Sequence, residues 1–156
     1  ATSMDLILWR HADAEPTGND MKRELTDKGR KQAARVAKWL REHTDGDWRV
    51  VSSPAARARQ TAEALHRDFE KCATLGPLET ENALLREVGW PHADKPVIVV
   101  GHQPTLGRVA ARLLTGRLGD LPVKKGSLWW FTTKVDEENG TGETILKAVI
   151  TPDLAA

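Results

Sequence analysis

Short runs of mostly hydrophobic residues mark the strands of this chain. Three runs predict short buried strands, at residues 5–9, 48–51 and 97–100. The run at residues 97–100 is apolar throughout, as a strand that helices cover on both faces should be. A further short strand is expected at Ala73–Leu75. The end of the chain differs, because two β-rich segments, residues 128–135 and 144–150, flank Asn139-Gly140, a dipeptide typical of hairpin turns.

Between the strands, hydrophobic residues recur every three or four positions, which indicates helices with one buried face. Thr26 can cap the first helix, and Pro54 suits the first turn of the second. Two more helices are expected over residues 81–90 and 105–115. Strands alternating with helices and closed by a hairpin predict an α/β fold. We expect a three-layer sandwich with a mainly parallel central sheet, helices on both faces and a C-terminal antiparallel hairpin.

Length and composition fit one soluble domain. The 156 residues are 40% hydrophobic and 29% charged, and no linker or repeat divides them, so a single domain over residues 1–156 is expected, with residues 1–3 left by cloning before Met4. A net charge of +1 and the lack of an apolar run of roughly 20 residues predict neither a nucleic-acid nor a membrane partner. The single cysteine, Cys72, excludes a Cys-rich zinc site and suits a cytoplasmic location.

Polar side chains follow each of the three buried strands. The strand ends carry Arg10 and His11, then Ser52 and Ser53, then Gly101 and His102. Parallel sheets bind ligands outside the carboxyl ends of their strands, so these residues should converge on one edge, with Arg57 one turn into the following helix. Each residue alone has a structural explanation, such as a hydrogen-bonded histidine or a solvated arginine. Together, two imidazoles and two guanidiniums favour a multiply charged anion such as phosphate.

Four motifs carry these residues in order. They are Leu8–His11 followed by a small residue, Leu25-Thr26-x-x-Gly29-x-x-Gln32-Ala33, Ser52-Ser53-Pro54-x-x-Arg57-Ala58-x-Gln60-Thr61-Ala62, and Val99-Val100-Gly101-His102-x-Pro104. In order and spacing they resemble the histidine phosphatase superfamily (phosphoglycerate-mutase-like) over about residues 5–115. The short chain looks most like the SixA-type phosphohistidine phosphatases.

The resemblance implies a catalytic site without metal or cofactor. His11 would be the nucleophile and become transiently phosphorylated, while Arg10, Arg57 and His102 would hold the phosphoryl oxygens. The chemistry agrees, because phosphoryl transfer needs mainly an in-line nucleophile and positive charge around the transferred oxygens. Neighbouring arginines should also keep His11 neutral and therefore nucleophilic. We expect a metal-independent phosphatase.

Two departures from the family pattern bear on the substrate. Ala12 stands where many relatives have glycine. Only 44 residues separate Arg57 from His102, too few for an elaborate lid, and no motif there selects a catalytic acid among three candidates, Glu79, Glu81 and Glu87. Esters need a proton on the leaving oxygen, worth about 10²–10⁴-fold in rate, whereas the imidazole of phosphohistidine leaves readily. The sequence therefore favours a phosphohistidine-bearing protein as substrate.

Several other functions remain open at this point. The chain could be a phosphomonoesterase or mutase for a small metabolite, or a non-catalytic phosphate-binding module. His11, Asp13 and His102 could instead hold a metal ion. Lys124-Lys125, just before the hairpin, is either a solvated turn or a patch that steers an acidic partner.

Overall fold

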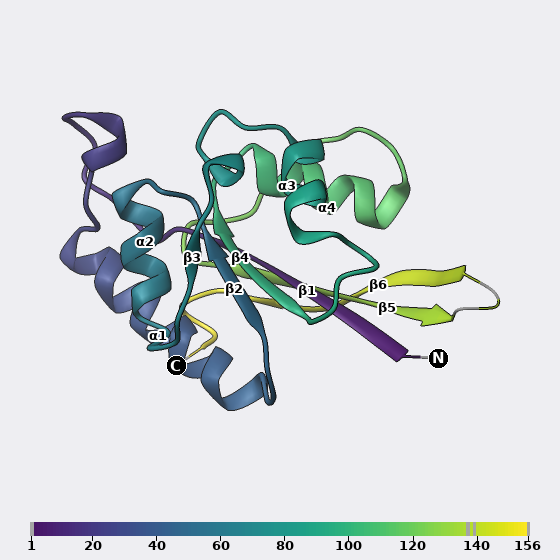
Figure 1. Cartoon of the computed structure of the whole chain (residues 1–156). Coiled ribbons are helices and arrows are strands. Elements are labelled where there is room, and N and C mark those ends of the chain that lie inside the picture. The colour runs from purple at the N-terminus through teal and green to yellow at the C-terminus, as the bar shows by residue number, and fades with distance from the viewer. Residues whose placement is uncertain (1, 137, 139, 156) are drawn as a thin grey trace.

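The computed structural model describes residues 2–136, 138 and 140–155 (Figure 1). The strands are β1 (Thr2–Arg10), β2 (Arg49–Ser52), β3 (Glu70–Lys71), β4 (Val97–Gly101), β5 (Leu128–Asp136) and β6 (Gly140–Ile150). The α-helices are α1 (Asp27–His43), α2 (Ala56–Glu63), α3 (Glu81–Val88) and α4 (Thr105–Thr115), joined by two short 3₁₀ helices, η1 (Asp20–Lys22) and η2 (Ala73–Leu75). No helix among these described residues is long and apolar enough to cross a membrane.

The strands form one sheet in the order β3-β2-β4-β1-β5-β6. The first four strands in this order are parallel, whereas β5 pairs antiparallel with both β1 and β6. Figure 1 shows α1 and α2 on one side of the sheet and α3 and α4 on the other. The predicted α/β sandwich with a C-terminal antiparallel hairpin is therefore confirmed. Of the predicted turn, Asn139 lies outside the described residues, and Gly140 has the positive φ of 77° that such turns require.

The central strand β1 explains why its hydrophobic run is continuous. Leu6 and Leu8 point into a core shared with α3 and α4, while Ile7 and Trp9 point into a second core shared with α1 and α2. All four side chains are fully buried. Because both faces are covered, no position in the run tolerates a polar side chain until the strand ends at Arg10.

Between β2 and α3 the structure corrects the sequence prediction. The strand expected at Ala73–Leu75 is the 3₁₀ helix η2, and the strand β3 lies two residues earlier, at Glu70–Lys71. Both residues of β3 are exposed, so this edge strand has no hydrophobic signal. The helix α3 ends at Val88 rather than near residue 90, because Gly89 adopts the left-handed conformation that terminates helices (φ 71°).

Candidate active site

Three neighbouring parallel strands, β2, β4 and β1, end at the same edge of the sheet. They deliver Arg10 and His11 from β1, Ser52 and Ser53 from β2, and His102 from β4. Adjacent strand ends are tied together directly, because the backbone N–H of His11 donates to the carbonyl of Gly101 (3.0 Å). The convergence expected from the topology is thus present in the structure.

A pocket of about 200 Å³ opens at this edge. Its lining residues are Arg10, His11, Ala14, Arg23, Arg57, Pro77, His102, Gln103 and Lys125. Four of these carry positive charge and, within the described part of the chain, none carries a carboxylate. The pocket is therefore suited to a small, multiply charged anion.

His11 is held in one tautomer by the backbone that follows it. Its Nδ1 lies 2.7 Å from the carbonyl oxygen of Ala12, and the side chain is 7% exposed. A carbonyl oxygen only accepts hydrogen bonds, so Nδ1 carries the proton. In the neutral ring, Nε2 is then left with a free lone pair, which is the requirement for a nitrogen nucleophile.

The charge state of His11 follows from its surroundings. Burial lowers the pKa of His11 to about 4, and the nearby guanidiniums of Arg57, Arg10 and Arg23 act in the same direction, against the hydrogen bond to Ala12. The imidazole is neutral at physiological pH. Both its tautomer and its charge state therefore leave Nε2 available for attack.

The second motif holds the loop that follows His11. Thr26 caps α1 by accepting the N–H of Gly29 and donates to the Asp13 carboxylate (2.7 Å). The side chain of Gln32 accepts the N–H of Asp13 (2.9 Å). A Cβ on Gly29 would lie only 1.9 Å from the Asp13 carbonyl oxygen, so glycine is required there. These contacts also draw the Asp13 carboxylate onto Thr26 and Lys125 (3.2 Å), and it does not line the pocket.

His102 faces His11 across the pocket, with their ring centroids 5.2 Å apart. The Nε2 of His102 is hydrogen-bonded to Ser53 Oγ (2.7 Å), and the same Oγ accepts the N–H of Ala55. The helix α2 begins at Ala56, with Ala55 as its N-cap, two residues beyond Pro54. Burial lowers the pKa of His102 to about 3, with His11 and Arg57 contributing, so this imidazole is neutral as well.

Arg10 and Arg57 place their guanidiniums beside the two histidines. Arg10 Nη1 donates to the carbonyl of Val123 (2.9 Å), while Arg57 Nη1 donates to the carbonyl of Asp20 (2.7 Å). The Nε of each arginine is buried and lacks a partner in the described structure, as does Nδ1 of His102. Burial lowers the pKa of both arginines. Buried donors without partners are uncommon and costly, and they gather here at one site.

Comparison with known proteins agrees with this geometry. A sequence profile of the histidine phosphatase superfamily (branch 1) matches residues 6–91, more than half of the chain. The chain belongs to the histidine phosphatase superfamily. His102 lies beyond the matched residues, and the fold brings it to the site.

Individual relatives of this histidine phosphatase span most of its length. It is 35% identical over 141 residues to an uncharacterised protein of Picosynechococcus, with 80% of this chain and 82% of that protein covered. It is 28% identical over 152 residues to a phosphohistidine phosphatase SixA homologue of Haemophilus influenzae, with 81% and 88% covered. The solved structure of a protein assigned as phosphohistidine phosphatase SixA from Nakamurella multipartitia superposes with a TM-score of 0.80 at 28% identity, covering 97% and 98%.

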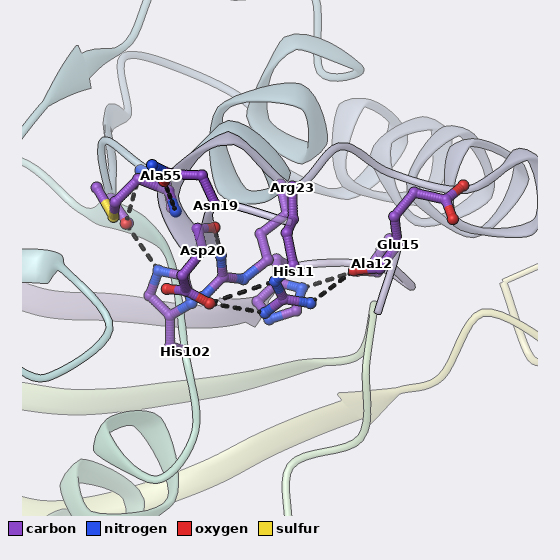
Figure 2. A network of polar contacts seen from close by, with 11 residues as sticks. His11, Ala12, Glu15, Asn19, Asp20, Arg23, Ala55 and His102 are labelled. Carbon is purple, nitrogen blue, oxygen red and sulfur yellow. Dashed lines mark hydrogen bonds and ion pairs between the residues drawn. The ribbon is translucent and has the colours of Figure 1, made fainter. Parts of the chain in front are cut away.

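Two residues of this histidine phosphatase site were missed by sequence reasoning, Asp20 and Arg23. The Asp20 carboxylate contacts Nη2 of Arg57 (3.4 Å) and Nη2 of Arg23 (3.0 Å), so it bridges two of the cations at the pocket. Figure 2 shows Asp20 between His11 and His102 in that view. The hydrogen bond from Arg23 lowers the pKa of Asp20, with Arg57 contributing, and the carboxylate is therefore ionised at neutral pH.

The three glutamates considered as catalytic acids, Glu79, Glu81 and Glu87, are not among the described residues that line the pocket. Glu81 is 3.8 Å from Arg112, and Glu87 is bound by Thr74 and Arg49 at the opposite end of the sheet. No group of three His, Cys, Asp or Glu side chains in the described ranges is placed to hold a metal ion.

Proposed function

We propose that this protein is a phosphohistidine phosphatase that removes the phosphoryl group from a histidine side chain of another protein through a phospho-His11 intermediate. The observation that carries the proposal is the neutral, Nδ1-protonated His11, whose Nε2 shares a small pocket with Arg10, Arg57 and His102. The 28% identity to a phosphohistidine phosphatase SixA homologue supports the same substrate class.

In the first step, Nε2 of His11 attacks phosphorus in line, and the P–N bond to the substrate imidazole breaks. If the other ring nitrogen of the substrate is protonated, that imidazole leaves as a neutral molecule. His11 then carries the phosphoryl group on Nε2 and a positive charge on its ring, which the bond from Nδ1–H to Ala12 stabilises. In the second step water attacks phosphorus, neutral His11 is released, and the product is dihydrogen phosphate.

Neither step needs a strong acid from the protein, and this favours phosphohistidine over esters. A phosphate ester would release an alkoxide unless a residue protonated the leaving oxygen. The Asp20 carboxylate contacts Arg57 and Arg23, and it is ionised. Its role in the proposed mechanism is that of a counter-ion, which the incoming phosphoryl group displaces from Arg57.

Positive charge at the transferred oxygens comes from protein side chains in this mechanism. Arg10 and Arg57 would hold the equatorial oxygens, as their planar guanidiniums match a phosphoryl group, and His102 would contribute a hydrogen bond from its ring. The proposed reaction is therefore metal-independent. We place it in the cytoplasm, because the buried, unpaired Cys72 fits a reducing compartment.

Steady-state rates on several phosphorylated substrates test the proposed function. We expect kcat/KM to be at least about 10²-fold higher for a phosphohistidine peptide than for glycerate or sugar phosphates, since only the esters need acid catalysis. Activity should persist in the presence of a chelator. An equal or higher kcat/KM on the metabolites would identify a small-molecule phosphomonoesterase. Tight phosphate binding without turnover of any substrate would identify a phosphate-binding module.

A further inference from the structure

A second, strongly basic cavity lies next to the catalytic pocket. It has a volume of about 490 Å³ and lies between α1, the segment before β5 and the turn after β6. Five cationic side chains line it, and we call it the basic trough: Lys28, Lys31 and Arg35 from α1, with Lys124 and Lys125. Among the described residues that line it, Asp153 is the only one with a carboxylate.

The positive charge of the basic trough is largely uncompensated. Lys28, Lys31 and Arg35 follow each other at helical spacing of three and four residues, so they lie along one exposed face of α1. Lys125 is paired with Asp13 (3.2 Å), but the other four cations have no ion pair within the described residues. The whole chain has a net charge of only +1, so this is a local concentration of charge.

The basic trough borders the catalytic pocket. Lys125 lines both cavities, and its partner Asp13 comes two residues after His11. Ser127 lines the trough, its Oγ is buried without a partner in the described structure, and its carbonyl accepts the backbone N–H of Arg10 (3.0 Å). A macromolecule that presents a phosphohistidine to His11 would therefore extend over the trough.

We propose that the basic trough is the docking surface for acidic side chains that flank the phosphohistidine of the substrate protein. This inference rests on the proposed function and names the chemistry of its partner. The occupant follows from charge complementarity. Long, exposed lysine and arginine side chains spread around a wide cavity fit several separate carboxylates on a protein surface better than one small anion. Such surface pairs steer association and contribute about two- to fivefold each to affinity.

The test compares two phosphohistidine peptides on two variants. One peptide carries glutamates on both sides of the phosphohistidine, and the other carries glutamines at the same positions. The variant K28E/K31E/R35E reverses the exposed face of α1 without changing any residue placed in the catalytic site. The control R86E/R117E/K134E makes the same change of charge at exposed positions away from the trough. Thermal unfolding verifies that both variants are folded.

We expect the wild-type protein to prefer the glutamate peptide by about tenfold or more in kcat/KM, mainly through KM, with a preference that falls as salt rises. The trough variant should lose this preference, the control should keep it, and both should hydrolyse the glutamine peptide within about twofold of the wild-type rate. A K28Q/K31Q/R35Q variant should lose the preference partially.

Four results would overturn the proposed docking surface while leaving the proposed function intact. Three of them are no preference in the wild-type protein, a preference retained by the trough variant, and an equal loss of preference in the control. The fourth is an equal loss of kcat/KM by the trough variant on the glutamine peptide, because the trough would then bind the phosphoryl group and not the acidic side chains that flank it. If the wild-type protein hydrolyses neither peptide, the proposed function itself fails, and the docking surface fails with it.

Discussion

The two ends of strand β2 each lie beside an arginine-containing site, and only one of these sites is suited to bind phosphate. At the start of β2, Arg49 lines a cavity of about 600 Å³, three times the volume of the pocket that holds His11. Its guanidinium donates to the carboxylates of Glu70 (3.3 Å) and Glu87 (3.2 Å) and to the Glu87 carbonyl (2.9 Å). Beyond the other end, Arg57 is buried with an unpartnered Nε.

The difference shows in the direction of the pKa shifts. The hydrogen bond to Glu70 raises the pKa of Arg49, with Glu87 adding to it, whereas burial lowers the pKa of Arg57 and Arg10. The carboxylates of Glu70 and Glu87 already neutralise the charge of Arg49, so Arg49 is not suited to bind a further anion. The positive charges of Arg10 and Arg57 in the small pocket are less completely neutralised by carboxylates, and a bound anion would neutralise them further. A lowered arginine pKa, rather than the volume of the cavity, therefore distinguishes the candidate active site.

Substitution of His11 should have the largest effect on activity, and His92, which lines the larger cavity, provides the control. We expect His11→Ala to lower kcat/KM by at least about 10⁴-fold, because it removes the proposed nucleophile. His92→Ala should leave the rate within about twofold of wild type. Full activity of the His11 variant in a phosphohistidine assay would refute covalent catalysis by His11.

The two arginines should separate activity from stability. Arg57→Ala should lower kcat/KM by about 10²–10³-fold, because it removes a hydrogen-bond donor to the transition state. The variant should lose little stability. Arg49→Ala should leave activity nearly unchanged but lower the free energy of unfolding by about 1 kcal/mol, because two partly exposed glutamates lose their partner. Urea denaturation and kinetics on both variants measure the contrast. The comparison breaks down if Arg49→Ala is the less active of the two.

The buried histidines should make stability depend on pH. The pKa of His11 is about 4 in the folded protein and about 6.5 when unfolded, so between these values the unfolded state binds more protons. Stability should therefore fall as pH drops from 7 to 4.5, by about 2 kcal/mol from His11, and His11→Ala should lose correspondingly less. Urea denaturation at both pH values gives this difference, and ¹⁵N NMR of the imidazole gives the tautomer. A His11 pKa near 6.5 would contradict the assigned environment.

Asp20 should have the smallest effect. Asp20→Asn removes the carboxylate that competes for Arg57, so phosphate and vanadate should inhibit about two- to fivefold more strongly, with kcat nearly unchanged. Asp68→Asn, at the larger cavity, serves as the control. A fall in kcat of about 10²-fold would instead identify Asp20 as a proton donor.

The strand-end residues were predictable because continuous apolar runs identify covered parallel strands, and topology brings the ends of such strands to one edge. Asp20 and Arg23 were not, since they lie in a polar segment without periodicity. Asp20 meets Arg57 only because residues 37 positions apart are brought together by the fold. Glu87 is the opposite case. It lies between Arg57 and His102 in the sequence, where a catalytic acid was sought, but in the fold its carboxylate contacts Arg49. Sequence distance alone did not reveal either placement.

Trapping the intermediate tests the central claim most directly. The protein is mixed with a phosphohistidine peptide, quenched at alkaline pH where phosphohistidine survives, digested and mapped by mass spectrometry, with ³¹P NMR to distinguish the two ring nitrogens. The proposed mechanism predicts one phosphoryl group on Nε2 of His11. A phosphoryl group on His102 or on Nδ1 of His11 would contradict the mechanism. Rapid turnover with no trapped phosphoprotein would also contradict it.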